Sequence, residues 1–273
     1  MSFTRIGANI TALQSLNELL KVNQRIGTGL LRLSSGKRIN SVGDDAAGFS
    51  LARGLEARRR SLTQAMQNVG TAKNVLTIGE GAYLAVSDLL QIIKEKTVMG
   101  ADDSFNSDQR AAIQGQINAL VLEIDAIVNE SSFQGTALID GTFTGKVFQT
   151  GGAAGDIFTV SMAAADSATL GVDALVVSSA ALASTAIADV DAAIITLNTN
   201  AQAVGEYLVR LGSKEATLAT TITNTEAARS RIEDADFAQE QMQLIRAQIV
   251  QQTAFSSFSQ ANTAPQLVLS LFR

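Results

Sequence analysis

Apolar residues recur at alternating steps of three and four over long stretches of both halves of this chain. In the first half one series repeats every seven residues, at Leu62, Val69, Leu76, Tyr83 and Leu90. In the second half the phase holds over five heptads, at Ile187, Val190, Ile194, Leu197, Ala201, Val204, Leu208 and Leu211, and it continues to Leu218 and Ile222. Such spacing places apolar side chains on one stripe of a helix. The single proline, Pro265, leaves these stretches uninterrupted. We therefore predict a mainly α-helical protein, a long antiparallel bundle or coiled-coil rod.

The elements of this rod can be placed approximately. The pattern predicts helices over about 44–98, over 107–129 and from about residue 184 onward. Asn106 and Gln109 have the spacing of a capping box at the start of the second of these helices. Between 131 and 177 glycine is frequent, and Lys146–Gln149 and Asp156–Val160 read as strands around a glycine-rich turn at 151–155. We expect a β-hairpin or small β-lobe there.

Gly70, Gly79 and Gly81 lie within the first long helical stretch. Each of Gly70, Gly79 and Gly81 weakens a helix by roughly 1 kcal/mol relative to alanine. Close packing of a neighbouring segment would explain why they are tolerated.

Both ends of the chain predict amphipathic helices. The stripe at the start contains Phe3, Ile6, Ile10, Leu13, Leu16 and Leu20, and the stripe near the end contains Met242, Ile245, Ile249, Phe255 and Phe258, before a last apolar run that includes Leu267, Val268, Leu269 and Leu271. Two interpretations remain open. The terminal helices could pack on each other as an ordinary pair, or they could complete their burial only against further copies of the chain, which in a non-closing arrangement gives a helical filament.

A polar, glycine-punctuated joint separates the first terminal helix from the rod. It runs from Leu33 to Gly48, and its marked residues are Ser34, Ser35, Gly36, Arg38, Asn40, Gly43, Asp44, Asp45 and Gly48. Serine and glycine end helices, and aspartates supply N-cap oxygens where the next helix begins. The glycines of the joint could also let it adopt different angles in different copies.

Composition excludes several kinds of chemistry. The chain has no Cys and no His, so thiolate nucleophiles and imidazole acid–base catalysis are absent. A net charge of −5 gives no basic surplus for nucleic acid. Asp102, Asp103, Asn106 and Asp108 lack the pattern of a calcium loop and predict a polar turn. We expect no enzyme activity, no cofactor, no metal and no nucleic acid.

Two further expectations concern charge and membranes. Arg58, Arg59 and Arg60 are expected on a solvated helix face, because successive helical residues point in different directions. The first twenty residues carry no unbroken apolar region of the kind found in a cleaved signal peptide. No apolar run long enough to span a bilayer is evident, so no membrane insertion is expected.

Three separated blocks of sequence resemble the bacterial flagellins. They are Leu33–Asn40 with Asp44–Gly48 at the front, Ser132–Gly135 with Leu138–Gly141 and Phe148–Gly151 in the middle, and Ser230–Asp236 with Gln260–Arg273 at the back. The resemblance implies a structural subunit that polymerises into the filament of the bacterial flagellum. It also implies this division: 1–33, N-terminal helix of a terminal core domain; 34–46, joint; 47–140, rod helices; 141–183, β-hairpin region; 184–229, C-terminal rod helix; 230–273, C-terminal helix of the core domain.

The family resemblance further implies where the subunit goes and what it meets. Family members leave the cell through the flagellar type III export machinery without a cleaved signal peptide, escorted by an export chaperone, and the filament is extracellular and meets hook-associated and cap proteins. By this resemblance the chaperone contacts are Phe255, Phe258, Leu267, Val268 and Leu271, and the filament core uses the two terminal stripes. The short middle implies that separate outer domains are absent.

One part of the chain departs from the family pattern. Many relatives present a patch on the first rod helix to a host Toll-like receptor. The matching residues here are Ile92, Lys94, Glu95 and Lys96, with Ile92 in place of the usual Arg and Lys96 in place of the usual Leu. We expect weak or absent recognition, and a simple solvated helix face is the alternative interpretation of Lys94–Lys96.

Two other functions compete with the filament subunit. A hook–filament junction protein shares similar terminal signatures. A secreted membrane-active translocator would use its amphipathic ends, although these carry few of the Trp, Lys and Arg anchors that favour a membrane interface.

Overall fold

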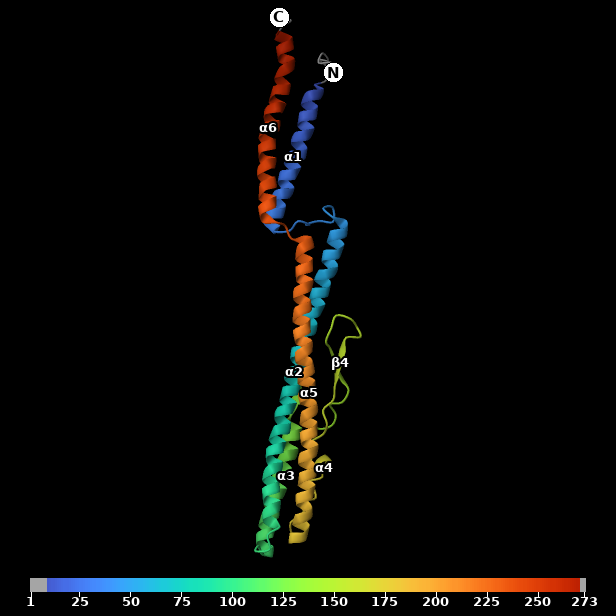
Figure 1. Cartoon of the computed structure of the whole chain (residues 1–273), viewed down its shortest axis with the longest axis vertical. Coiled ribbons are helices and arrows are strands. Elements are labelled where there is room, and N and C mark those ends of the chain that lie inside the picture. Colours follow the sequence, from blue (N-terminus) through green and yellow to red (C-terminus); the bar gives the residue numbers. More distant parts are fainter. Residues whose placement is uncertain (1–8, 271–273) are drawn as a thin grey trace. The chain divides into compact units, whose positions relative to one another are not determined.

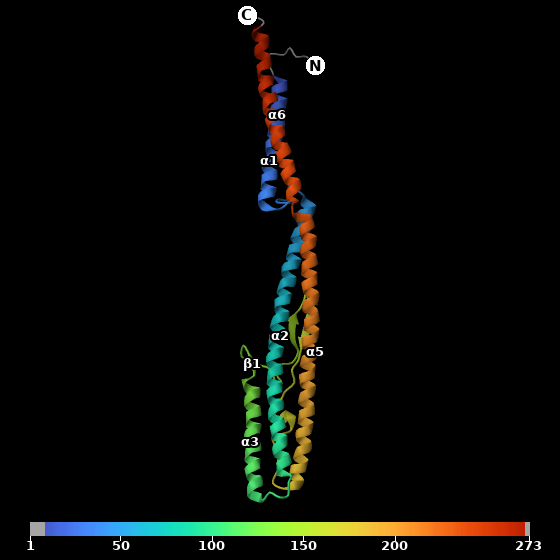
Figure 2. The same cartoon turned by 60° about the vertical axis from the view of Figure 1, so that its left-hand side comes forward.

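The computed structural model describes residues 9–270, and the side chains of residues 9–263. The chain divides into two compact units, one formed by Met1–Arg59 with Asn224–Arg273 and the other by Arg60–Thr223. Helices dominate both units (Figures 1 and 2), as the apolar spacing predicts. The long helices α2 (Ala46–Gly100) and α5 (Ala180–Glu233) each contribute residues to both units.

The first unit contains a pair of antiparallel helices. They are α1 (Ile10–Ser35) and α6 (Phe237–Ser270), which lie side by side in Figure 1. The Asn9 side chain caps α1 by accepting a hydrogen bond from the Ala12 amide, and Gly36 ends the helix at φ +71°. Ile6 and Leu271 lie outside the described residues, and the side chains of Leu267, Val268 and Leu269 lie outside the described side chains.

The second unit is built on the two heptad series. Leu62, Val69, Leu76, Tyr83 and Leu90 of α2 are buried, and so are the heptad-spaced Val190, Leu197, Val204, Leu211 and Leu218 of α5. Ion pairs of Lys73 with Glu215 at 2.7 Å and of Lys94 with Asp191 at 2.5 Å show that the two helices run in opposite directions. The predicted antiparallel rod is confirmed.

A third helix and two small hairpins complete this unit. Helix α3 (Ser107–Glu130) begins with the predicted capping box of Asn106 and Gln109. Strands β3 (Lys146–Gln149) and β4 (Ile157–Val160) form the predicted antiparallel hairpin. A second hairpin pairs β1 (Ser132–Phe133) with β2 (Thr136–Ala137) through Gln134 and Gly135, which both have positive φ, as a two-residue primed turn requires.

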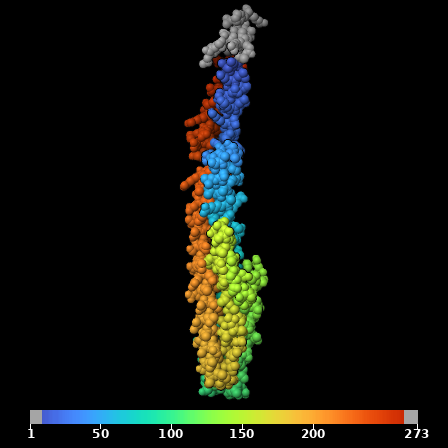
Figure 3. Space-filling model, turned by 90° about the vertical axis from the view of Figure 1, so that its right-hand side faces the viewer, coloured from blue at the N-terminus to red at the C-terminus, as the bar shows by residue number. Residues whose placement is uncertain are grey.

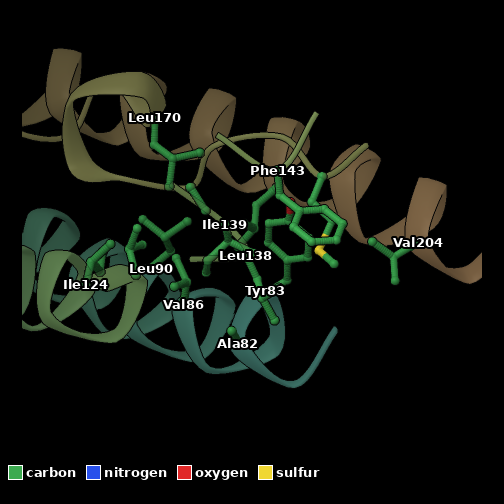
Figure 4. Close-up of a cluster of buried hydrophobic side chains, with 14 of the residues drawn as sticks. Ala82, Tyr83, Val86, Leu90, Ile124, Leu138, Ile139, Phe143, Leu170 and Val204 are labelled. Carbon is green, nitrogen blue, oxygen red and sulfur yellow. The ribbon is translucent and has the colours of Figure 1, made fainter. Parts of the chain in front are cut away.

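The connection after the hairpin lies along the helices and closes the core. Figure 3 shows it in yellow beside α5 in orange, and it includes the short helix α4 (Ser167–Leu170), which the sequence does not predict. Leu138, Ile139 and Phe143 point between the helices toward Tyr83 and its neighbours (Figure 4). Burial raises the pKa of Tyr83 to about 12, and its hydroxyl donates a 2.5 Å hydrogen bond to the Ala163 carbonyl. The protonated phenol therefore fastens the connection to α2.

A buried arginine organises the turn between α2 and α3. The Arg110 guanidinium donates hydrogen bonds to the carbonyls of Gly100, Asp102 and Phe105. The Asp102 carboxylate accepts from the Ser104 amide, which lowers the pKa of Asp102. These contacts give the acidic residues of this segment the turn role that their sequence suggests.

Helix bounds differ from expectation by a few residues. α2 begins at Ala46 and ends at Gly100, and α5 begins at Ala180 and reaches Glu233. The early start of α5 follows from Ser179, whose hydroxyl oxygen accepts a hydrogen bond from the Leu182 amide.

We expected no segment long and apolar enough to span a membrane, but three of the described helices meet these criteria of length and composition. α2, α3 and α5 each contain an 18-residue window of mean hydropathy 1.2 to 1.6 with at most two charged residues. Ala, Val, Leu and Ile are spread among Thr, Ser and Gly in these windows, so the mean is high although no unbroken apolar run exists. The buried part of these windows belongs to the core described above.

Of Gly70, Gly79 and Gly81 in α2, close packing explains one. A Cβ added at Gly79 would lie 2.6 Å from the Met162 Sδ, whereas nothing lies within 4 Å of a Cβ at Gly70 or Gly81. Gly79 therefore makes room for the buried Met162, and the structure gives no packing reason for the other two.

This difference predicts opposite effects of alanine in one helix. Gly79→Ala forces Met162 to move within a close-packed core, and we expect a loss of about 1–3 kcal/mol in the free energy of unfolding. Gly81→Ala is the matched control, and it is expected to stabilise by up to about 1 kcal/mol, because alanine favours the helix. Urea unfolding measures both, and equal effects of the two substitutions would contradict the packing argument.

Candidate assembly surface and joint

The α1·α6 pair meets along a seam in which small residues alternate with larger apolar ones. Ala12, Leu19, Val22 and Gly29 of α1 are buried. Leu19 follows Ala12 by seven positions, and Gly29 follows Val22 by seven positions. On α6 the less exposed positions follow coiled-coil steps of four and three, at Glu240, Leu244, Ala247, Gln251, Ala254, Phe258 and Ala261. A Cβ placed on Gly29 would lie 3.7 Å from Leu244, so this glycine lets α6 approach α1 closely.

Polar contacts fix the register of the seam. The Asn9 amide donates to the Ala261 carbonyl at 2.8 Å, Gln251 donates to Asn23 at 2.6 Å, and Arg32 pairs with Glu240 at 3.1 Å. The first and the third of these contacts lie near opposite ends of the helix pair, and the second lies between them. Sliding one helix along the other would therefore break all three.

Most of the large apolar side chains of α1 and α6 stay outside this seam. We call them the terminal apolar surface: Ile10, Leu13, Leu16, Leu20, Leu30 and Leu31 of α1, and Phe237, Met242, Ile245, Ile249, Val250 and Phe255 of α6. Leu20 is 57% exposed and Phe255 is 63% exposed. The two helices do pack on each other, and this packing leaves their larger residues uncovered.

The predicted assembly residues therefore separate into two groups. Ile10, Leu13, Leu16, Leu20, Ile245, Ile249 and Phe255 belong to the exposed surface, whereas Phe258 is half-buried in the seam. Sequence reasoning missed Ala12, Leu19 and Val22 as seam residues. The seven-residue steps from Ala12 to Leu19 and from Val22 to Gly29 were the available signal, hidden by the larger residues of the exposed stripe.

The joint is shorter than its sequence suggests. Ser34 and Ser35 still belong to α1, and Gly36 is the residue that ends it. Asp45 caps α2 by accepting from the Gly48 amide at 2.9 Å. Asp44, also expected to cap, instead accepts hydrogen bonds from the amides of Asn40 and Ser41, which lowers the pKa of Asp44.

The glycines of the joint have different tasks. Gly36 has φ +71°, which favours glycine, and a Cβ added at Gly48 would lie 2.7 Å from the Cδ1 of the buried Ile39. Only Gly43, whose added Cβ would meet nothing closer than 3.6 Å, is free of such a requirement. Two of the three glycines thus fix the shape of the joint.

Two chain segments run side by side at the joint. The amides of Arg38 and Ile39 both donate to the Glu233 carbonyl, and the Ala235 amide donates to the Gly36 carbonyl. Lys37 and Asp234 form an antiparallel bridge, and the Arg38 guanidinium donates to the Ile232 carbonyl at 2.6 Å. The link between α1 and α2 is therefore tied to the link between α5 and α6.

An ion network surrounds this bridge. Lys37 pairs with Glu233 at 2.6 Å, Glu233 with Arg229 at 2.5 Å, and Arg229 with Glu226 at 2.5 Å and with Glu56 at 3.7 Å. The Lys37 ammonium, followed by Arg229, lowers the pKa of Glu233, and Arg229 lowers the pKa of Glu226. We call Lys37, Glu56, Glu226, Arg229 and Glu233 the joint network. The three- and four-residue spacing of its α5 members is its sequence signal.

Some charged residues lie in other surroundings than expected. Arg59 pairs with Glu56 at 2.9 Å and Glu226 at 3.3 Å, so the predicted solvated face is wrong for this residue. Lys94 pairs with Asp191, which excludes a purely solvated role, whereas Ile92 and Glu95 are exposed and Lys96 is half-buried.

Comparison with known proteins supplies the identity of this architecture. Residues 6–144 match the family described as bacterial flagellin N-terminal helical region, and residues 187–272 match the bacterial flagellin C-terminal helical region. The chain is 30% identical to flagellin FlaB1 of Treponema pallidum over 98% of this chain and 99% of that protein. It is 32% identical to a flagellin of Bacillus subtilis over 98% of this chain and 100% of that protein.

Solved structures agree in fold. A Bacillus cereus flagellin matches with a TM-score of 0.51 at 25% identity, covering 60% of this chain and 94% of that one. A hook-associated protein described as putative, from Vibrio parahaemolyticus, matches with a TM-score of 0.60 at 14% identity, covering 70% and 100%, which shows a shared fold alone. The chain therefore belongs to the bacterial flagellins: it is a structural subunit of the extracellular flagellar filament that serves motility, and not an enzyme.

Proposed function

We propose that this flagellin assembles by covering its terminal apolar surface with the same helices of neighbouring copies. The observation that carries the proposal is the exposure of large aliphatic and aromatic side chains along both α1 and α6, although these two helices already pack on each other. A monomeric soluble protein rarely exposes so large an apolar patch. Because a heterologous contact that does not close gives a helix, the surface suits a filament.

The same exposure makes a chaperone necessary before assembly. We place its contact on α6, with Phe255 as the exposed anchor, Phe258 from the edge of the seam, and Leu267, Val268 and Leu271 from the family resemblance. A cover on these residues would suppress aggregation during passage through the type III export machinery. Contacts with hook-associated and cap proteins would use the same ends of the subunit.

Weak recognition by a host receptor also belongs to the proposal. Lys94 is engaged with Asp191, and Ile92 replaces a charged residue of the family patch. An aliphatic side chain cannot supply the hydrogen bonds and charge of an arginine.

Removal of either terminal segment tests the assembly mechanism. A chain lacking residues 1–20 or 255–273 is expected to stay folded and helical, because the second unit has its own core, and to lose polymerisation. Electron microscopy of seeded or salted-out protein measures filaments, and circular dichroism measures helicity. A truncated chain that still forms filaments would refute the mechanism.

A pair of leucines tests the surface itself. Leu16→Gln with Leu20→Gln removes two side chains that are 36% and 57% exposed, so covering the rest of each is worth about 1 kcal/mol, and we expect the critical concentration for polymerisation to rise at least about 10-fold. Leu20→Met keeps the apolar volume and is the control expected to polymerise. Sedimentation of polymer measures the effect, and an unchanged critical concentration for the double variant would contradict the proposal.

The joint network predicts a sensitivity to acid. Glu226 and Glu233 have lowered pKa values in the folded chain, so their stabilising effect is present above the unfolded-state pKa near 4.5 and is lost as the pH falls through the folded-state values. Glu233→Gln removes one of these groups. We expect its Tm to fall less than that of the wild type between pH 6 and pH 3, as measured by differential scanning calorimetry. Parallel Tm curves for the two proteins would show that the network does not act in this way.

A further inference from the structure

One side of the α1·α6 pair carries a groove lined by cations. Its volume is about 620 Å³, and Lys21, Arg25 and Arg32 of α1 and Arg246 of α6 line it, together with Gln243, Val250 and one carboxylate, Glu240. Since 3.6 residues make one turn, Lys21, Arg25 and Arg32 lie on the opposite side of the α1 seam from Leu13, Leu16, Leu20, Leu30 and Leu31. On α1 the cations and the exposed leucines thus lie on opposite flanks, whereas on α6 Val250 of the terminal apolar surface lies at the groove.

The groove contains positive charges and a hydrogen-bond donor that have no partner among the described residues. Lys21 pairs with Glu18 and Arg32 with Glu240, whereas Arg25 and Arg246 form no ion pair with any residue that the structure describes. The Arg32 Nε is buried and has no acceptor among these residues. A buried guanidinium N–H without an acceptor is costly, which favours an anionic group in the groove.

The first unit also contains the opposite charge without a partner. All five of its glutamates, Glu18, Glu56, Glu226, Glu233 and Glu240, are ion-paired inside the subunit. Its four aspartates are Asp44, Asp45, Asp234 and Asp236, and none pairs with a described cation. We call them the joint aspartates; Asp45 is half-buried and the other three are exposed. They gather at the joint, beside one end of the groove, where Asp236 lines an adjoining hollow together with Gln243 and Arg246 of the same subunit.

We propose that the cationic groove of one subunit receives the joint aspartates of a second copy of the chain. The inference rests on the proposed assembly of neighbouring α1·α6 pairs and adds a polar contact to it. In a homopolymer with heterologous contacts, two different surfaces of the same subunit meet, and these two are complementary in charge. The apolar surface drives association, and the groove selects the register in which copies associate.

Amide substitutions test the contact without disturbing the fold. Arg25→Gln with Arg246→Gln neutralises the groove, and asparagine at all four joint aspartates neutralises the joint. Asparagine keeps the acceptor oxygens with which Asp44, Asp45 and Asp236 bind backbone amides, and it caps helices as well as aspartate does. Circular dichroism verifies that each variant is folded, and the same cycle on the Tm of the monomer is expected to be additive; coupling in the monomer would place the contact inside one subunit and overturn the proposal.

The decisive measurement is a double-mutant cycle on the critical concentration. We expect each set alone to raise it about fivefold, in the range of one or two exposed ion pairs, and the combined variant to raise it no further. A combined effect equal to the product of the two separate effects would overturn the proposal, because the surfaces would then act independently. No effect of either set would overturn it as well and would leave the groove to another partner.

Two controls separate this proposal from the assembly mechanism. Lys96→Gln with Lys214→Gln removes the same positive charge from the second unit and is expected to leave the critical concentration unchanged; an equal rise would assign the effect to net charge and overturn the groove. If the four asparagines unfold the chain, Asp234→Asn with Arg246→Gln replaces them in the cycle, since no described hydrogen bond uses the Asp234 side chain. A raised critical concentration in Leu16→Gln with Leu20→Gln, together with an unchanged one in both charge sets, would reject this inference and keep the apolar mechanism.

Discussion

A helix with more apolar surface than one partner can cover must meet a second partner, and this constraint governs the ends of the molecule. The seam between α1 and α6 buries Leu19, Val22 and Leu244 but also uses Ala12, Gly29, Ala247 and Ala254, which bring the helices close together, and other large residues such as Leu20 and Phe255 face outward. A wider seam would have buried them and produced a self-contained helical hairpin. Small residues in the seam thus keep the assembly surface available.

The second unit, in contrast, buries its apolar stripes within one chain. Its heptad series on α2 and α5 are buried against each other and against the connection that carries Leu138, Ile139 and Phe143 (Figure 4). Tyr83 fills the core, its hydroxyl fastens the later connection that follows β4 through the Ala163 carbonyl, and Gly79 makes room for Met162. A core completed within one chain gives a unit that needs no neighbour, as expected for the part of a subunit that folds before assembly.

The joint is stabilised by backbone hydrogen bonds and ion pairs. The link from α1 to α2 pairs with the link from α5 to α6, and Glu233 participates twice, through its carbonyl and its carboxylate. The glycines suggested free bending, but Gly36 and Gly48 hold one shape through a left-handed φ and a close contact with Ile39. Any change of angle must therefore break identifiable contacts.

The heptads at Leu62–Leu90 and Val190–Leu218, the Asn106 cap and the β3–β4 hairpin follow from local sequence, because periodicity and turn chemistry act over a few residues. The family could also be inferred, because the order of residues in the joint and at both ends is specific. Tertiary structure decided what periodicity cannot: which face of α1 meets α6, that Arg59 and Lys94 are paired, that Asp44 folds a turn instead of capping a helix, and that cations and leucines occupy opposite flanks. The physical reason is that an apolar stripe shows how much apolar surface a helix carries, but not how much of that surface is covered within one chain. The covered area depends on how closely a distant segment approaches the helix. Small residues such as Gly29 allow that close approach, and no local pattern reveals their role.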